Sequence, residues 1–273
     1  MKKLITIIIA ALLAVTACLG LTACGGVTYK DLAIVEVGGE TESFGIAFRK
    51  GSNLTRMVED AIAEIVEEGK LAPLATKYGV AGVSEYVPQA AANEDSGDFA
   101  AIQQNGKLVV GITDYKPMDY KEEGSEEWIG FDADLAREVG LKLNIAIEFK
   151  EIDWDNKLLD LKAGRIDCIW NGMTITNEIL ADADVSVPYM ENRQVAVVLK
   201  TNAEKYSTLE KMAGAKIAAE SGSAGETFVK ENATIAAGLV AVTAQSDAFL
   251  EVMSGKSDIA IVDYMMAKAL IEG

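Results

Sequence analysis

Short runs of β-branched residues alternate with amphipathic segments along most of the chain, and this alternation limits the fold more than any other feature. The clearest helical segment covers residues 53–68, where Leu54, Val58, Ile62 and Ile65 form one apolar stripe. The pattern is typical of an α/β fold with mainly parallel sheets. We expect strands at residues 32–37, 44–48, 108–112, 145–149, 166–170, 195–199, 216–219 and 259–262. Further helices are expected over 131–139, 153–163, 225–231, 246–253 and 263–271.

The first 24 residues read as an export signal. Lys2 and Lys3 precede an apolar run over residues 4–15, which is shorter than the roughly 20 residues that a membrane-spanning helix needs. Small residues then lead to Cys24, so the segment resembles a bacterial lipoprotein signal that is cleaved before a lipidated cysteine. Cys18 is a poorer candidate, because cleavage there would leave an apolar stub. The alternative is an ordinary buried N-terminal helix. We therefore expect a lipid anchor on the extracytoplasmic face of the cell membrane.

The composition excludes several classes of protein. The chain carries 25 Lys and Arg against 42 Asp and Glu, for a net charge of −17, which argues against binding to nucleic acid or anionic lipid. Histidine is absent, so Ser-His-Asp and Cys-His catalysis and histidine-ligated zinc are excluded. Cys168 lies in an apolar run and is expected to be a buried, inert thiol without a disulfide partner. We expect no cofactor and no metal.

Eight short motifs follow one another between residues 106 and 263. Together they resemble the family-3 solute-binding proteins of ABC importers for polar amino acids. The resemblance implies a type II periplasmic-binding-protein-like fold, with two lobes and a ligand cleft between them. It also implies an extracytoplasmic, monomeric protein that captures a small polar solute, expected to be an amino acid, for the permease of an ABC transporter. The motifs are GKLVVG (106–111), GFDADLA (130–136), IDWDNK (152–157), GRID (164–167), WNGMTIT (170–176), PYM (188–190), GSAGE (222–226) and DIAIVD (258–263).

The segment before these motifs stands outside the family order. Residues 43–51, the helix after them and residues 75–80 resemble the end of such a protein, yet here they come first. Conversely, the family continues after the 263–271 helix into a strand like that at 32–37. We therefore expect a circular permutation, which is tolerated at exposed loops. A junction between parts of tandem genes is the rival account.

The permutation predicts a specific division of the chain. Residues 27–41 would supply a strand to lobe 2, residues 42–193 would form lobe 1, and residues 194–273 would complete lobe 2. Residues 81–98, which lack apolar periodicity, would be the linker that joins the usual termini. The hinge is expected near residues 42–44 and 193–195.

Two places suit the charged ends of an amino acid. Asp263 follows a strand and begins a helix, where the ligands of open α/β sheets bind, so we expect it to receive the ammonium group. Helix N-capping is its alternative role. Ser221, Ser223 and Ala224 lead into another helix, whose free N–H groups suit a carboxylate.

Other contacts are expected at the ends of two strands of lobe 1. Asn171, Gly172 and Thr174, placed after the 166–170 strand, would add carbonyl and hydroxyl contacts. The pocket for the ligand side chain is expected to involve Asp114, Tyr115, Met118, Tyr120 and Trp170.

The chain departs from its family at one position. Where the family has Pro-Glu-Arg, with an arginine that clamps the ligand carboxylate, this chain has Asn177, Glu178 and Ile179. The change removes a pair of charge-assisted hydrogen bonds, each worth about 1.5–3 kcal/mol. Weak binding, a ligand without an α-carboxylate and no binding all stay open, and Arg193 is a candidate substitute.

Two rival functions use the same fold. A dehydratase-like enzyme acting on prephenate or arogenate would need a carboxylic acid with a raised pKa in the cleft, and Glu220 and Asp114 are candidates. A sensory or binding-impaired homologue is the other alternative.

Overall fold

The computed structural model describes residues 26–81, 85–90 and 97–273. The predicted signal, with Cys18 and Cys24, and most of the residues between 82 and 96 in the predicted linker lie outside the described residues. Within the described part of the chain, no helix is long and apolar enough to cross a membrane.

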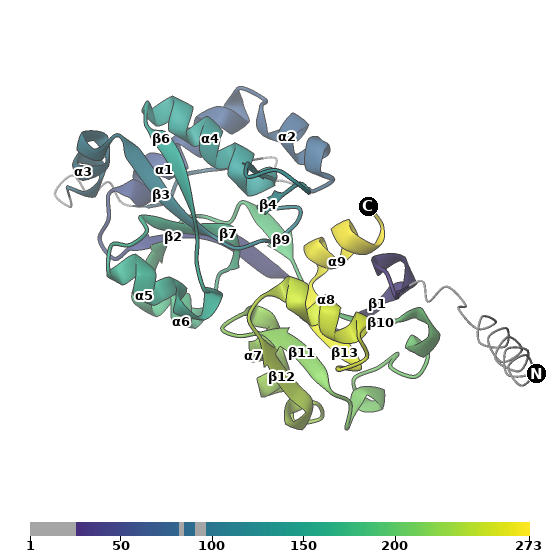
Figure 1. The fold of residues 1–273 in the computed structure, drawn as a ribbon. Coiled ribbons are helices and arrows are strands. Elements are labelled where there is room, and N and C mark those ends of the chain that lie inside the picture. The colour runs from purple at the N-terminus through teal and green to yellow at the C-terminus, as the bar shows by residue number, and fades with distance from the viewer. Residues whose placement is uncertain (1–25, 82–84, 91–96) are drawn as a thin grey trace, which may run out of the picture.

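The chain folds into two lobes, each built around one sheet (Figure 1). In lobe 1 the sheet is mixed: β3 runs parallel to β6 and β7, whereas β2 runs antiparallel to β7, β8 and β9. The strand order is β6 (Ala146–Glu151), β3 (Lys107–Ile112), β7 (Cys168–Thr174), β2 (Glu42–Arg49) and β8 (Ala183–Val185), and β9 (Met190–Asn192) also pairs with β2. A two-stranded sheet joins β4 (Tyr120–Lys121) to β5 (Trp128–Ile129).

The sheet of lobe 2 contains strands from both ends of the chain. β11 runs parallel to β12 and β13, whereas β10 runs antiparallel to β1 and β13. The prediction of mainly parallel sheets is therefore wrong, because β2 and β10 enter their sheets from the other lobe and run against their neighbours. The order is β1 (Leu32–Glu36), β10 (Gln194–Leu199), β13 (Ile259–Asp263), β11 (Ile217–Glu220) and β12 (Leu239–Val242).

Two connections cross between the lobes. Residues 37–41 lead from β1 in lobe 2 to β2 in lobe 1, and Arg193 alone separates β9 in lobe 1 from β10 in lobe 2. Both crossings lie at the same side of the molecule, since β2 and β9 pair with each other and β1 and β10 pair with each other.

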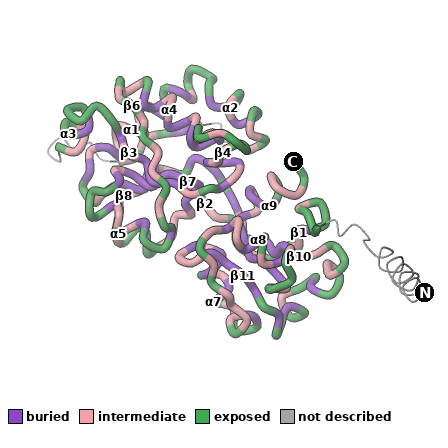
Figure 2. Tube along the Cα trace, in the orientation of Figure 1, coloured by how far each residue is buried: buried purple, intermediate pink, exposed green. Residues whose placement is uncertain are grey.

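Helices cover both faces of each sheet and leave the central strands buried (Figure 2), whereas the edge strands β6 and β12 are only partly buried. In lobe 1, α1, α2 and α4 pack on one face, and α5 contacts β2 and β7 on the other. In lobe 2, α8 and α9 cover one face and α7 the other. The helices are α1 (Leu54–Glu67), α2 (Leu71–Tyr78), α3 (Asp98–Asn105), α4 (Phe131–Leu143), α5 (Lys157–Lys162), α6 (Asn177–Asp182), α7 (Ala224–Glu231), α8 (Gln245–Met253) and α9 (Tyr264–Ile271).

Several elements differ from the sequence prediction, and α2, α3, α6, β4, β5, β8 and β9 were not predicted. β12 was not predicted, and its four residues are only partly buried. α4 continues past Val139 through Gly140, because that glycine lies against Ile145 and Ile147, where a Cβ would come within 2.9 Å of both. β7 begins two residues later than predicted and extends to Thr174, so Asn171 and Gly172 lie within the strand instead of after it.

Candidate functional site

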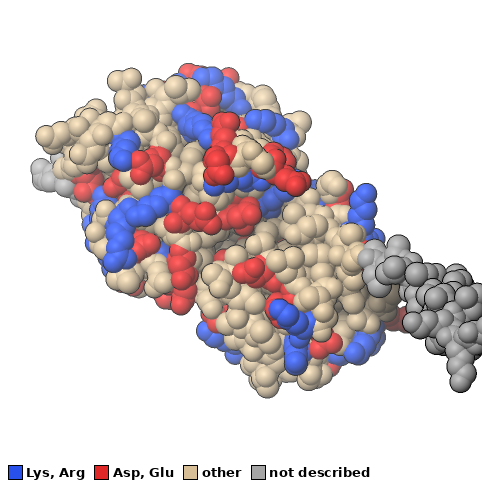
Figure 3. All heavy atoms as spheres, viewed as in Figure 1, with Lys and Arg blue, Asp and Glu red and all other residues tan. Residues whose placement is uncertain are grey.

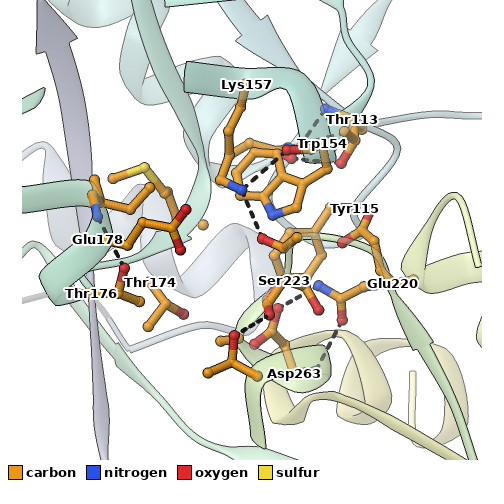
Figure 4. A pocket seen from close by; sticks show the side chains of 18 residues that line it. Thr113, Tyr115, Trp154, Lys157, Thr174, Thr176, Glu178, Glu220, Ser223 and Asp263 are labelled. Carbon is orange, nitrogen blue, oxygen red and sulfur yellow. Dashed lines mark hydrogen bonds between the residues drawn. The ribbon is translucent and has the colours of Figure 1, made fainter. Parts of the chain in front are cut away.

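A small cavity lies where the two lobes meet (Figure 4). Its volume is about 50 Å³, enough for a few water molecules, since one water needs roughly 10–15 Å³. This volume is well below the roughly 300–1,000 Å³ that ligand pockets usually have. Lobe 1 contributes Thr113, Tyr115, Trp154, Lys157, Asn171, Gly172, Met173, Thr174, Thr176, Glu178 and Ile179, and lobe 2 contributes Glu220, Gly222, Ser223, Ala224, Thr227, Gln245 and Asp263.

Asp263 is the most heavily hydrogen-bonded group of the cavity. Its Oδ1 accepts from Nδ2 of Asn192 at 2.5 Å and from Nε2 of Gln194 at 2.7 Å, and its Oδ2 accepts from Nε2 of Gln245 at 2.5 Å. The carboxylate makes no capping bond to α9, so the alternative role of helix N-cap is not used. Burial raises the pKa of Asp263, although the three amide donors oppose this shift.

Glu220 is a second buried acid in the same wall. It ends β11, is 3% exposed and faces the cavity. Burial, and then the negative charge of Asp263, raises the pKa of Glu220 to about 8, whereas Lys157 lowers it. Glu220 is therefore largely protonated at neutral pH and can donate as well as accept a hydrogen bond.

Lys157 is the cation that lines the cavity. It begins α5 in lobe 1, and its Nζ donates to the carbonyl oxygens of Trp154 at 3.1 Å and of Gly222 at 2.7 Å. Gly222 belongs to lobe 2, so this bond joins the lobes across the cavity. The contact is close, because a Cβ on Gly222 would lie 2.9 Å from Cα of Asp155. Burial lowers the pKa of the Lys157 ammonium, and Glu220 and Glu178 oppose that shift.

The start of α7 forms the floor of the cavity on the lobe 2 side. Ser223 is the N-cap, and its Oγ accepts from the backbone N–H of Glu226 at 3.1 Å. The first helical N–H, that of Ala224, has no hydrogen-bond partner among the described residues. Because the first N–H groups of a helix point out of its end and carry partial positive charge, this one is available to an anion.

The residues of β7 are tied into lobe 1 by their own hydrogen bonds. The Asn171 amide bonds the backbone of Thr113 in both directions and donates to Asp119 at 2.8 Å. The backbone N–H of Gly172 donates to Asp132 at 2.7 Å. Gly172 has φ of +55°, and a Cβ there would lie 2.6 Å from the Tyr115 ring. A bulge opposite β2 therefore presents Gly172 to the cavity.

Five other predicted residues do not line the cavity. Met118 and Trp170 are fully buried behind its wall, and Trp170 packs edge-on against Tyr189. Asp114 is exposed and Ser221 is half-buried; both lie next to lining residues in the sequence, but neither lines the cavity. Tyr120, in β4, lies beneath Nζ of Lys116 at a different groove. The structure thus brings together Tyr115, Asn171, Gly172, Thr174, Ser223, Ala224 and Asp263 and leaves the others out.

Arg193, the expected substitute for the family arginine, does not line the cavity. Its guanidinium donates to Glu36 at 2.9 and 2.7 Å and stacks 3.6 Å from the ring centroid of Tyr264, at the hinge and away from the cavity. Ile179 is buried with Trp154 on the outer face of the lobe 1 sheet and lines the cavity with its apolar side chain.

Sequence reasoning missed Lys157, Trp154 and Gln245 as cavity residues. Lys157 belongs to one of the family motifs, but a lysine that opens a helix looks exposed in a sequence. Gln245 precedes no recognisable motif, and only its contact with Asp263 reveals it. Among the described residues, no group of three or more His, Cys, Asp or Glu side chains could hold a metal ion. Acidic and basic side chains are interspersed over both lobes on the face drawn in Figure 3.

Comparisons with known proteins agree with this architecture. The model of the bacterial extracellular solute-binding proteins, family 3, matches residues 108–263. The chain is 28% identical over 167 residues to the probable ABC transporter arginine-binding protein ArtJ of Chlamydia trachomatis, and 29% identical over 171 residues to the cyclohexadienyl dehydratase of Pseudomonas aeruginosa. Each match covers 61% of this chain and spans only 63% of the length of the relative.

A solved structure is similar over a comparable part of the chain. The arginine-bound form of truncated ArgBP from T. maritima matches with a TM-score of 0.60 at 31% identity, over 63% of this chain and 81% of that one. The predicted two-lobe, type II periplasmic-binding-protein-like α/β fold is thereby confirmed.

Proposed function

The chain belongs to the bacterial extracellular solute-binding proteins of family 3, and on that premise we propose that it captures a small polar solute, an amino acid, in the cavity between its lobes. The observation that carries the proposal is the arrangement of charge in that cavity. The buried acids Asp263 and Glu220 face the same space as the Lys157 ammonium and Ala224, whose N–H has no partner in the described part of the chain. A zwitterion matches such a site at both of its ends.

We expect at least one amino acid to raise the melting temperature of the chain. A ligand at 100 times its dissociation constant stabilises a folded protein by about 2.7 kcal/mol, which a thermal melt followed by circular dichroism detects. The panel contains the twenty amino acids and, as controls, simple sugars of similar size. One clean melting transition that none of the amino acids shifts would contradict the proposal.

Delivery of the solute requires a transporter and a place at the membrane. We propose that the protein acts as a monomer, delivers its ligand to the permease of an ABC transporter and is held at the extracytoplasmic face of the membrane by lipid on Cys24. The lipoprotein-like pattern of residues 1–24 supports the anchor. Metabolic labelling with a radioactive fatty acid tests it, since Cys24→Ala should abolish incorporation.

A dehydratase is the second candidate, and one observation favours it. The pKa of Glu220, about 8, is that of an acid able to donate a proton at neutral pH. The similarity to the Pseudomonas aeruginosa cyclohexadienyl dehydratase is in the same range as that to ArtJ. Turnover of prephenate or arogenate by the wild-type chain, lost in Glu220→Gln, would establish the enzyme in place of the passive binder.

We also propose that the chain is a circular permutation of its family, divided at residues 27–41, 42–193 and 194–273, with residues 81–98 as the joining linker. The family match begins only at residue 108, yet β2 pairs with β7 and α1 packs on α4, so residues 42–78 lie in the same lobe as the matched part. β1 likewise pairs with β10.

If the chain is a circular permutation, a chain with its segments rearranged into the family order should still fold. In the rearranged chain, residues 97–273 come first, a Gly/Ser linker follows, and residues 26–80 come last. We expect it to melt within a few degrees of the original and to bind the same amino acid, because every strand keeps its partners. The original chain with the same Gly/Ser segment added at its end is the control. A rearranged chain that does not fold would contradict the proposal.

A further inference from the structure

Lys157 is a buried charge with no direct ion pair among the described residues, although its Nζ lies 4.8 Å from the centroid of the Trp154 ring and Glu220 and Glu178 act on it electrostatically. The residue is 8% exposed, and both of its hydrogen bonds go to backbone carbonyl oxygens. It forms no ion pair with any carboxylate of the described residues. Because an ammonium has three N–H donors, one of them is unassigned. A buried charge is usually paired, since desolvation without a partner is costly, so an unpaired ammonium at a cavity wall indicates a place for an anionic group.

Other donors of the cavity face the same space as this ammonium. The backbone N–H of Ala224, at the start of α7, has no partner among the described residues, and the Ser223 hydroxyl uses its oxygen as an acceptor and keeps its proton free. Figure 4 shows Lys157 reaching from lobe 1 into the space above Ser223 in lobe 2. An anion that bridges Lys157 and Ala224 would therefore touch both lobes.

The cationic end of a ligand has its own place in the cavity. Asp263 and Glu220 face the cavity from the strand ends of lobe 2. The hydroxyl group of Tyr115 is buried in the same wall and interacts with the Asp263 carboxylate. The cavity therefore has acidic groups for a ligand ammonium and, at Lys157, an unpaired cation for a negative group.

We infer that Lys157 receives the carboxylate of the bound amino acid and, through the N–H of Ala224, uses that carboxylate to draw the lobes together. The inference rests on the proposed function, since it assigns a role within the same cavity. In this structure the Lys157 ammonium donates to the carbonyl oxygen of Gly222 directly. With ligand bound, the carboxylate would lie between the lobes and accept hydrogen bonds from the Lys157 ammonium of lobe 1 and the backbone N–H of Ala224 of lobe 2.

Matched ligands with and without a carboxyl group test this role. Each amino acid that raises the melting temperature is compared by calorimetry with the amine that lacks its carboxyl group, beginning with L-arginine and agmatine and with L-histidine and histamine. In Lys157→Met we expect the affinity for the amino acid to fall about 10- to 100-fold, the equivalent of one lost charge-assisted bond. The affinity for the amine should stay the same or rise, because a repelling charge is gone.

The ratio of the two affinities separates a carboxylate contact from a general weakening of the cleft. Lys157→Arg should keep most of the preference for the amino acid, and Lys256→Met, which removes an exposed lysine with the same change in net charge, should leave both affinities unchanged. If Lys157→Met does not fold, Lys157→Gln takes its place. Equal losses for both ligands, or no loss for either, would overturn the inference alone. If no amino acid binds the wild-type chain, the inference falls together with the proposed function.

Discussion

Replacing Glu220 by glutamine is expected to protect the protein against alkaline unfolding, by on the order of 4 kcal/mol between pH 5 and pH 9. The folded state raises the pKa of Glu220 from its usual 4.5 to about 8. Between these two values the folded protein binds a proton that the unfolded chain has released. The stability from this group is therefore complete below pH 4.5 and is lost as the pH rises through 8. Glutamine has nearly the same shape as glutamic acid and does not ionise. The variant therefore does not lose the part of the stability that depends on the protonation of Glu220.

Urea unfolding at pH 5, 7 and 9 measures the effect. Burial also raises the pKa values of Asp132, Asp263 and Glu42, so the wild-type protein and the variant both lose stability with rising pH, and only the difference between their curves belongs to Glu220. Glu231→Gln, at the exposed end of α7, is the control and should follow the wild-type curve. A Glu220→Gln curve that also runs parallel to the wild type would mean that Glu220 is already ionised in the folded protein.

Asp263→Ala is expected to abolish amino-acid binding and to destabilise the fold by about 3–5 kcal/mol, the cost of leaving the partners of a buried charged network unsatisfied. Asn192, Gln194 and Gln245 all donate to this one carboxylate. Without it, three buried amide donors lose their common acceptor, and the ligand ammonium loses its expected partner. We expect the affinity to fall by more than about 100-fold, a loss of roughly 2.8 kcal/mol.

Calorimetry measures the loss of affinity, and urea unfolding measures the loss of stability. Asp263→Asn should bind as poorly as Asp263→Ala, because one oxygen becomes an amide group that faces other amide donors. Glu231→Gln again serves as the control with the same change in charge as Asp263→Asn. Wild-type affinity in either Asp263 variant would show that the carboxylate holds only the fold, and an unchanged unfolding free energy would show that the three amides find other partners.

The sequence predicted most strands because their apolar runs are buried in the middle of two sheets, as in β3 and β13. Asp263 could be predicted because the end of a strand is a general position for ligand contacts. The conformation of Gly172 could not, since its positive φ depends on a bulge against β2, which lies about 125 residues earlier in the chain. The burial of Lys157 depends in the same way on Gly222 in the other lobe.

The pocket aromatics illustrate a second limit. Trp170 and Tyr115 both lie near strand ends, and the sequence pattern treats them alike. In the structure, Tyr115 lies in the cavity wall, whereas Trp170 fills the core beside Tyr189. The difference arises because Tyr115 follows β3, whereas Trp170 lies inside β7, a strand that extends to Thr174 and so beyond its predicted end.

The pairing of β1 with β10 has a consequence for how the molecule assembles. The two strands are joined residue by residue from Leu32–Leu199 to Glu36–Val195, although about 160 residues separate them. As the chain emerges in order, all the strands of lobe 1 become available before β10 does. β1 has no partner strand until β10 has been synthesised, and an unpaired strand edge can pair with other chains. Lobe 1 is therefore expected to fold first, and the interval before β10 arrives is the time when the newly made protein most needs protection from aggregation.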